Sequence, residues 1–221
     1  MTADNKGKRL VKYVPDYVVF DLETTGINCN SDDIIEISAI KVANREIVDT
    51  FSTLVNPERG IPRQATAVNG ITDEMVAEAP LLKEVLSDFL LFTKGQVLVG
   101  HNIHSFDLKF IRQSAERIFG MTIENDYIDT LYMARNCLPE LSHYKLVDIS
   151  AHFKISAEGA HRAMNDCIMN QKCFEAMSGL QQDMQIEVCP KCGGELMKRS
   201  GKFGSFFGCG NFPNCRYTRN N

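Results

Sequence analysis

The sequence predicts an α/β fold with a mixed sheet, followed by a small metal-binding segment. Apolar, β-branched runs come first and indicate strands, and amphipathic helices then alternate with further apolar runs. Four cysteines are clustered after residue 188, apart from four scattered ones. With 221 residues and 44% hydrophobic content, the chain is long enough for one full domain and a small second one.

Three strands are expected near the start of the chain. The first contains the apolar run at residues 17–20 and leads into the hexapeptide Asp21–Gly26. Residues 34–42 and 47–55 are the next two runs rich in β-branched side chains. A short polar turn separates these two runs, so we expect an antiparallel meander. A further buried strand is expected at residues 96–100.

Helices are predicted after this meander from apolar side chains at helical spacing and from capping residues. Leu82, Leu86 and Phe89, for example, recur on one side of a helix. Asp129 is expected to cap a helix, because a carboxylate there accepts a backbone N–H. The expected helices are residues 61–69, 72–79, 80–92, 105–119, 130–137, 145–153 and 160–180.

Asp21 and Glu23 lie two positions apart at the end of the first strand. Side chains alternate across a strand, so both acids point to one face, roughly 6–7 Å apart at their roots. Two carboxylates at the end of a buried strand cost free energy unless something positive lies between them. A divalent cation would meet that need, although two ordinary solvated acids are the simpler interpretation of this spacing alone.

Two later acids and a histidine favour the cation. Asp107 begins one helix, Asp166 lies in the first turns of another, and His161 lies at the start of that second helix. Four carboxylates in one cleft would repel each other without cations, and such an oxygen-rich set suits Mg²⁺ or Mn²⁺. Two such ions can activate a water and stabilise the leaving oxygen of a phosphodiester. A histidine can take the proton of that water near neutral pH.

Three motifs that contain these residues resemble those of the DEDDh family of 3′→5′ exonucleases, in the same order. They are Asp21–Gly26, His101–Asp107 and His161–Asp166. The family contains the proofreading ε subunit of bacterial DNA polymerase III. A histidine five positions before the last aspartate marks the histidine subclass of the family. The resemblance covers about residues 15–180.

The resemblance implies a ribonuclease-H-like fold with a five-stranded mixed sheet. It implies that Asp21, Glu23, Asp107 and Asp166 hold two Mg²⁺ or Mn²⁺ ions and that His161 is the general base. It also implies a set of side chains that bind the terminal nucleotide, in which Ile71 wedges against the last base. These substrate-binding residues are Thr24, Thr25, Gly26, Ile71, Asn102 and Phe106. Phe106 has an equally good alternative place in the core, and His101 and His104 favour structural roles.

The clustered cysteines Cys189, Cys192, Cys209 and Cys215 follow the spacing C-x₂-C-x₁₆-C-x₅-C. Four thiolates complete a tetrahedral zinc site, and small modules of this kind fold around the metal. A redox Cys-x-x-Cys pair is the alternative. We disfavour it because two more cysteines follow at the distance typical of a zinc ribbon.

The cysteine-rich tail is basic and aromatic. From Cys189 onward it has six Lys or Arg and one Glu, a net charge of +5, which leaves −9 for the preceding part. Basic residues interleaved with aromatic ones suit single-stranded nucleic acid, although some of the rings must also form the small core of the module. The tail resembles the C-terminal zinc ribbons of bacterial type IA topoisomerases, which implies binding of single-stranded DNA. The expected contact residues are Lys198, Arg199, Lys202, Phe203, Phe206, Phe207, Arg216 and Tyr217.

The predicted organisation is a flexible arm at residues 1–14, an exonuclease domain at 15–180, a linker at 181–188 and a zinc ribbon at 189–221. The expected function is metal-dependent 3′→5′ removal of nucleoside 5′-monophosphates, with a single-stranded DNA 3′ end as the favoured partner. A polymerase-bound proofreading subunit, an RNA-trimming enzyme and a non-catalytic single-strand binding module are the alternatives. The sequence contains no recognisable signal peptide or membrane span, and its scattered thiols indicate a reducing cytoplasm. The sequence leaves the oligomeric state open.

Overall fold

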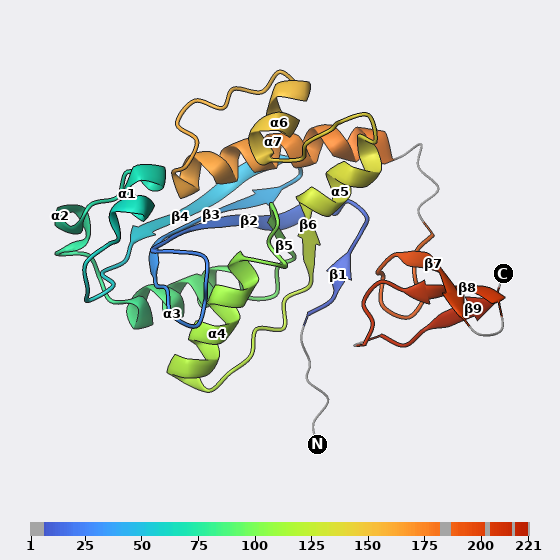
Figure 1. The fold of residues 1–221 in the computed structure, drawn as a ribbon, viewed down its shortest axis with the longest axis horizontal. Helices are drawn as coiled ribbons and strands as arrows, with labels where there is room; N and C mark the ends of the chain where they lie inside the picture. Colours follow the sequence, from blue (N-terminus) through green and yellow to red (C-terminus); the bar gives the residue numbers. More distant parts are fainter. Residues whose placement is uncertain (1–6, 182–186, 202–203, 214, 221) are drawn as a thin grey trace.

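The computed structural model describes residues 7–181, 187–201, 204–213 and 215–220. Within these residues, one part is a mixed sheet of six strands with helices on both faces (Figure 1). The other part is a three-stranded sheet that follows the last helix. This arrangement agrees with the α/β class and the separate small module that the sequence predicts.

The predicted meander is confirmed. Strands β2 (Asp16–Thr24), β3 (Ile34–Ala43) and β4 (Glu46–Leu54) pair antiparallel in chain order. Strand β5 (Leu98–Gly100) pairs parallel with β2, and β6 (Tyr127–Asp129) pairs parallel with β5. The full order across the sheet is β1-β6-β5-β2-β3-β4. The carboxyl ends of β2, β5 and β6 therefore meet at one edge, where α/β proteins collect functional groups.

Strand β1 (Arg9–Leu10) is the sixth strand, and it corrects two expectations. It pairs parallel with β6, so the sheet has one strand more than the five expected. Val11, which follows it, is 5% exposed. The segment expected to be a flexible arm therefore joins the fold from residue 9. A two-residue strand has no alternating pattern that could have revealed it.

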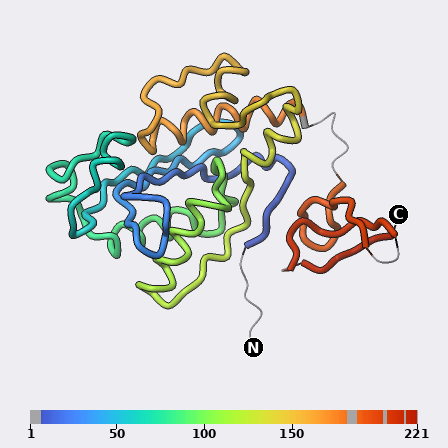
Figure 2. The backbone as a smooth tube through the Cα atoms, viewed as in Figure 1, coloured from blue at the N-terminus to red at the C-terminus, as the bar shows by residue number. Residues whose placement is uncertain are grey.

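Seven helices lie within the described residues, and each agrees with a predicted helix to within three residues at either end. Helices α3 and α4 cover one face of the sheet, and α5, α6 and α7 cover the other (Figures 1 and 2). The short helices α1 and α2 follow β4 at one end of the sheet. The bounds are α1 Arg63–Asn69, α2 Asp73–Val76, α3 Leu82–Phe92, α4 Asp107–Phe119, α5 Thr130–Cys137, α6 Leu146–His152 and α7 Ala163–Gln181.

The alternation of β2 decides which way its acids point. Phe20 packs toward α3, where its ring centroid lies 5.1 Å from that of Phe89. Tyr17 packs under α7, 4.9 Å from the ring centroid of Phe174. Odd-numbered side chains of β2 therefore face α7, and Asp21 belongs to this face. The hydrophobic pattern of the strand thus directs the acid toward the helix that contains the last motif.

The ribbon contains strands β7 (Leu196–Gly201), β8 (Gly204–Cys209) and β9 (Thr218–Asn220), which pair antiparallel in that order. The N–H of Leu196 donates to the carbonyl oxygen of Glu187. Hydrogen bonding within the ribbon therefore begins two residues before the expected boundary at 189. In the part of the chain that the structure describes, no helix is both long enough and apolar enough to cross a lipid bilayer.

Candidate active site and metal centres

Three of the four predicted acidic ligands converge at the carboxyl end of β2. Asp21, Glu23 and Asp166 each place one carboxylate oxygen within 4.8 Å of those of the other two. Asp21 and Glu23 are two positions apart on β2 and point to the same face of the sheet. Asp166 lies in the first turn of α7, which packs on that face. An all-oxygen donor set of this size fits a hard divalent cation.

Asp107 lies beside this triad without belonging to it. It is the first residue of α4 and is 3% exposed. Its negative charge is, after burial, the largest cause of the raised pKa of Asp21. The structure therefore brings Asp107 to the neighbourhood of Asp21, as the sequence predicts, while its carboxyl lies outside the compact group of three.

The electrostatics of the cluster favour a bound cation. Burial, followed by the charges of Asp107, Asp166 and Glu23, raises the pKa of Asp21 well above its usual value. Burial and then the charge of Asp166 raise the pKa of Glu23 to about 8. Burial also raises the pKa of Asp107 to about 7, although backbone N–H groups partly oppose it. A divalent ion would reverse these shifts by favouring the ionised carboxylates.

His161 lies next to the acids in an unusual backbone conformation. Its φ angle is +68°, in the left-handed region, and its N–H donates to Oδ2 of Asp166 at 2.9 Å. The residue is exposed and precedes the first residue of α7. Local hydrogen bonding thus fixes the backbone of His161 to one of the three converging acids.

A cleft of about 760 Å³ opens over the triad. It contains the three acids and His161 together with basic, aromatic and apolar side chains from α5 and the segment before α6. A larger hollow, of about 1010 Å³, lies near the C-terminal ends of α3 and α4 but contains none of the predicted site residues. The lining of the smaller cleft is Asp21, Leu22, Glu23, His101, Asn102, Leu131, Arg135, Ser142, His143, Tyr144, Lys145, Leu146, Val147, His161 and Asp166.

The predicted nucleotide-binding turn is closed by its own hydrogen bonds. Thr24 donates through Oγ1 to the carbonyl oxygen of Gly26 at 2.6 Å, and Thr25 accepts at Oγ1 from the N–H of Asp33 at 2.9 Å. A Cβ on Gly26 would lie 2.4 Å from the carboxylate of Asp32, so a larger residue there would require the Asp32 side chain to move. These three residues border the acids in sequence, but none of them lines the cleft.

The other three predicted substrate-binding residues have different outcomes. Asn102 lines the cleft. Phe106 does not, and its ring packs 5.1 Å from that of Phe110, which agrees with the alternative place in the core. Ile71 is fully buried against Ile35 and Val76, so it does not present a wedge to solvent. The resemblance implied that Ile71 contacts the substrate. The packing of α1 and α2 against β3 instead buries its side chain.

Asp129 has the capping role that the sequence predicts, and it also holds the loop after β5. It accepts a hydrogen bond from the N–H of Leu131 in the first turn of α5. It also accepts from the N–H groups of Asn102 and His104. His104 bonds in turn to the hydroxyl of Tyr127 at 2.6 Å, which indicates a structural role for this histidine.

Sequence reasoning missed the basic wall of the cleft. Arg135, His143 and Lys145 line the same cleft as the acids. Positive charge there suits a polyanionic substrate that approaches a negative centre. The available signal was the stretch around Tyr144, which resembles the exonuclease family, but a single Lys or Arg in a loop has no spacing that distinguishes it from a solvated charge.

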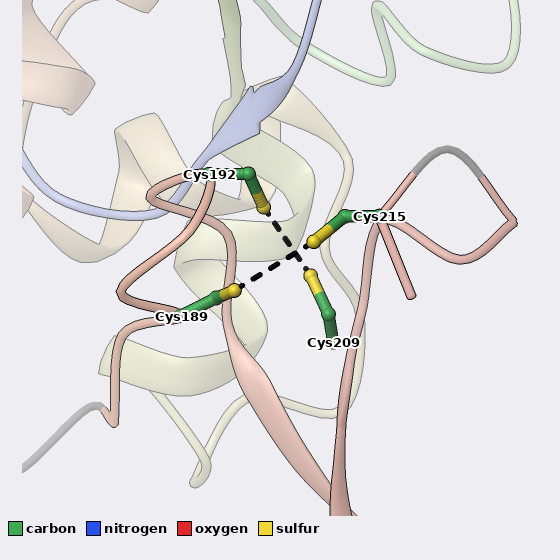
Figure 3. Close-up of side chains that lie close together, drawn as sticks. All are labelled: Cys189, Cys192, Cys209 and Cys215. Atoms are coloured by element: carbon green, nitrogen blue, oxygen red, sulfur yellow. Dashed lines mark hydrogen bonds between the residues drawn. The ribbon is translucent and has the colours of Figure 1, made fainter. Parts of the chain in front are cut away.

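The four predicted zinc ligands come together in the ribbon, as Figure 3 shows. The Sγ atoms of Cys189 and Cys215 are 3.8 Å apart, and those of Cys192 and Cys209 are 3.3 Å apart. These distances exclude disulfides, whose S–S length is about 2.05 Å. Ligands 2.3 Å from a tetrahedral zinc lie roughly 3.8 Å from each other, so the four thiols fit that ion.

Hydrogen bonds favour the ionised form of one of these thiols, that of Cys192. Burial opposes the thiolate of Cys192, but hydrogen bonds from the Asn211 side chain and from the backbone of Gly194 lower its pKa to about 7. The N–H of Asn211 also lies 3.4 Å from Sγ of Cys209. Donors directed at the sulfurs are the usual surroundings of a structural metal site.

The predicted contact residues of the ribbon lie in different surroundings. Phe207 and Tyr217 pack against the cysteine core, which agrees with the expectation that some rings form that core. Phe206 lines a hollow of about 240 Å³ together with Arg199, Arg216 and the 61% exposed Phe212. Lys198 is exposed on β7. Lys202 and Phe203 lie outside the described residues.

Comparisons with known proteins give one match for the α/β domain and a separate match for the ribbon. A family model described as "Exonuclease" matches residues 18–174, and one described as "Topoisomerase DNA binding C4 zinc finger" matches residues 186–221. The chain is 41% identical over 184 residues to a DNA polymerase III PolC-type protein of Caldanaerobacter subterraneus. This match covers 83% of the chain but only 13% of that much longer relative.

A relative of similar size and two solved structures complete the comparison. DNA polymerase III subunit epsilon of Treponema pallidum is 36% identical, with 73% of this chain and 75% of that protein covered. A structure of exonuclease X with 5′ overhanging duplex DNA has a TM-score of 0.56 at 27% identity, covering 75% and 91% of the two chains. Exonuclease I of E. coli with a dT13 oligonucleotide has a TM-score of 0.70 at 18% identity, covering 92% and 54%, and shows the shared fold. The chain belongs to the exonuclease family and ends in a C4 zinc ribbon.

Proposed function

We propose that this chain is a 3′→5′ exonuclease that removes nucleoside 5′-monophosphates from DNA, with single-stranded 3′ ends as the preferred substrate. The observation that carries the proposal is the triad of Asp21, Glu23 and Asp166 within a cleft that also contains His161. Membership of the exonuclease family supports it. The cleft has a volume of about 760 Å³, and its basic residues can contact phosphates.

The four acids would hold two Mg²⁺ or Mn²⁺ ions, and Asp107 would complete the set. When bound, such ions would supply Lewis-acid activation of a water and stabilisation of the leaving oxygen. His161 would accept the proton of the attacking water, because it is exposed at the cleft and is not itself among the converging oxygen ligands. Asn102 and Lys145, which line the same cleft, would orient the terminal nucleotide and its phosphate.

The ribbon would bind the single strand behind its 3′ end. One zinc ion held by the four cysteines would maintain its fold. The hollow lined by Phe206, Phe212 and Arg216 offers aromatic faces for a base and a cation for its phosphate. This assignment agrees with the DNA-binding description of the family model that matches the tail. The four cysteines outside the ribbon form no disulfide, which supports a reducing compartment such as the cytoplasm.

Proofreading for a DNA polymerase is the second candidate function. The relatives named as DNA polymerase III PolC-type and subunit epsilon favour it. A ribbon that binds DNA by itself favours independent action instead. The two candidates predict different behaviour when a polymerase is added, because a proofreading subunit gains activity from its partner whereas an independent nuclease does not.

The test compares single-stranded DNA, blunt duplex DNA and RNA of one sequence, each labelled at the 5′ end, with Mg²⁺ or Mn²⁺. We expect a ladder of products shortened from the 3′ end of single-stranded DNA, and slower digestion of the other two. Asp21→Ala is the control and should give no ladder. Equal activity in this variant would exclude the proposed site, and preferential digestion of RNA would overturn the proposed substrate.

A further inference from the structure

Glu36 is a buried carboxylate beside the acidic cluster that the proposed reaction does not use. It lies on β3 directly opposite Glu23 of β2, and its side chain is 4% exposed. Its charge is among the causes that raise the pKa of Glu23, so it opposes the ionised state that a cation site requires. The presence of this fifth acid therefore needs a separate explanation.

Three donors occupy the two carboxylate oxygens of Glu36. Nη2 of Arg162 donates to Oε1 at 2.9 Å, and Nε donates to Oε2 at 3.3 Å. The backbone N–H of Ala163, the first residue of α7, also donates to Oε2 at 3.3 Å. Bidentate pairing of this kind fixes both direction and distance. Glu36 is also absent from the group of converging metal-ligating oxygens.

Glu36 binds the turn at residues 161–163, which contains His161. Arg162 and Ala163 directly follow this histidine, whose φ angle of +68° is unfavourable for a residue with a side chain. One side of the turn is held by the hydrogen bond from the His161 N–H to Asp166. On the other side of the turn, Glu36 accepts hydrogen bonds from the Arg162 side chain and from the N–H of Ala163. Within the described residues, no other side chain accepts a hydrogen bond from these two groups.

We propose that Glu36 and Arg162 are a positioning pair that holds the turn at residues 161–163 so that His161 faces the cleft. The inference rests on the proposed function, because it concerns the residue assigned as general base. Arg162 is 43% exposed on its other side, so contact with a DNA phosphate is the competing role. A positioning role changes kcat, whereas a phosphate contact changes KM.

The variants are Arg162→Gln, Glu36→Gln, the double variant of both, His161→Ala and His161→Ala combined with Arg162→Gln. Arg45→Gln is the matched control, since Arg45 also pairs with a mostly buried glutamate, Glu175 at 3.5 Å, in the C-terminal half of α7. Steady-state cleavage of 5′-labelled single-stranded DNA is measured with saturating Mn²⁺. Hydrogen exchange of the His161 amide and Mn²⁺ binding by calorimetry are measured without DNA.

We expect Arg162→Gln to lower kcat about 10- to 100-fold, with KM within about twofold of wild type, because a displacement of about 1 Å can cost 100-fold. The His161 amide should exchange faster in this variant, and Arg45→Gln should change neither quantity. In the His161→Ala background, adding Arg162→Gln should lower kcat less than twofold, because the pair acts through the histidine. Glu36→Gln should bind as many Mn²⁺ ions as wild type.

Three results would overturn the inference. They are a rise in KM with unchanged kcat, an equal loss of kcat with and without His161, and the loss of one Mn²⁺ ion in Glu36→Gln. If Arg162→Gln does not fold, Glu36→Gln replaces it, because the amide keeps the length of the side chain but removes the charge and one of the two acceptor oxygens. The same fall in kcat and the same faster exchange of the His161 amide are then expected. If the wild-type chain cleaves no substrate, the proposed function fails, but the amide exchange and the Mn²⁺ titration still test the pair.

Discussion

Asn211 links the zinc centre to the main sheet through Arg9. Its Nδ2 donates to the carbonyl oxygen of Arg9 in β1 at 3.0 Å and lies 3.4 Å from Sγ of Cys192. The guanidinium of Arg9 lies 4.1 Å above the ring of Tyr132 in α5. The ribbon therefore contacts the exonuclease domain through a side chain that also touches Cys192, one of the proposed zinc ligands. Figure 1 shows the ribbon beside β1.

Replacing Asn211 by Ala should loosen the ribbon from β1. We expect amide hydrogen exchange at residues 9–11 to become roughly fivefold faster, the effect of losing one hydrogen bond worth about 1 kcal/mol. Exchange measured by mass spectrometry reports this change, and zinc content should stay at one ion per chain. Asn30→Ala, on an exposed loop, is the control. Unchanged exchange at residues 9–11 would show that the contact does not secure the ribbon.

Removing residues 189–221 should weaken binding more than it slows chemistry. The tail carries a net charge of +5, and the remaining −9 repels a polyanion outside the metal site. Affinity for a labelled single strand, measured by fluorescence anisotropy, should fall at least about tenfold and become less dependent on salt. Turnover at saturating DNA should change less than threefold. An equal fall in both would mean that the ribbon contributes to the cleavage step.

Asp166→Asn should remove a cation ligand while preserving the shape of the side chain. Cleavage should fall by more than about 100-fold, as for the loss of a preorganised electrostatic contact. Calorimetry with Mn²⁺ should show weaker binding or fewer ions than wild type. Near-normal rates in this variant would contradict the assignment of Asp166 as a ligand. Asp148→Asn, in the first turn of α6, is a matched control.

His161→Ala should separate chemistry from metal binding. Loss of a general base costs roughly 100- to 10,000-fold in turnover. Mn²⁺ affinity and the thermal midpoint should remain near wild type, because the side chain is exposed and the N–H that bonds Asp166 is retained. Quenched single-turnover assays measure the cleavage step directly. A variant that turns over normally would remove His161 from the mechanism.

The acidic cluster should make stability depend on pH when Mg²⁺ and Mn²⁺ are absent. The pKa of Glu23 is about 8 in the folded chain against an ordinary 4.5, so between these values the folded state binds more protons than the unfolded state. The free energy of unfolding should therefore fall as pH rises through this window, by at most about 1.4 kcal/mol per pH unit for each proton involved. Asp107, with a pKa raised to about 7, acts in the same sense.

Urea unfolding at pH 5, 6.5 and 8 in buffers free of Mg²⁺ and Mn²⁺ measures this dependence. Glu23→Gln should reduce the slope, and adding Mg²⁺ should stabilise the wild type most at pH 8. Stability that is constant or rises across the window would contradict the raised pKa values.

The parts of the fold that follow a repeating pattern could be predicted from the sequence. Alternation along β2 and capping at Asp129 are local, so the meander and the helices were found. The spacing of Asp21 and Glu23 alone favoured two solvated acids. The converging acids were identified because three motifs in the same order resemble those of the exonuclease family.

What the sequence did not reveal depends on distant contacts. Strand β1 is too short for a pattern, and its partner β6 lies more than 100 residues away. Ile71 looked available for substrate, but tertiary packing on Ile35 buried it. No sequence pattern marks Glu36, because its partner Arg162 is 126 positions further along. These contacts form only when the sheet and helices have packed together, so no local sequence pattern reveals them.

The division of the triad between β2 and α7 has a consequence for how activity arises. Glu23 and Asp166 are about 140 residues apart in the chain, so a growing polypeptide has no complete site until α7 has been made and packed. The proposed cation ligands therefore cannot come together while only the early strands have folded. A cut in the segment at 139–143 would separate Asp21 and Glu23 from Asp166, so recovery of nuclease activity would report reassembly of the two pieces.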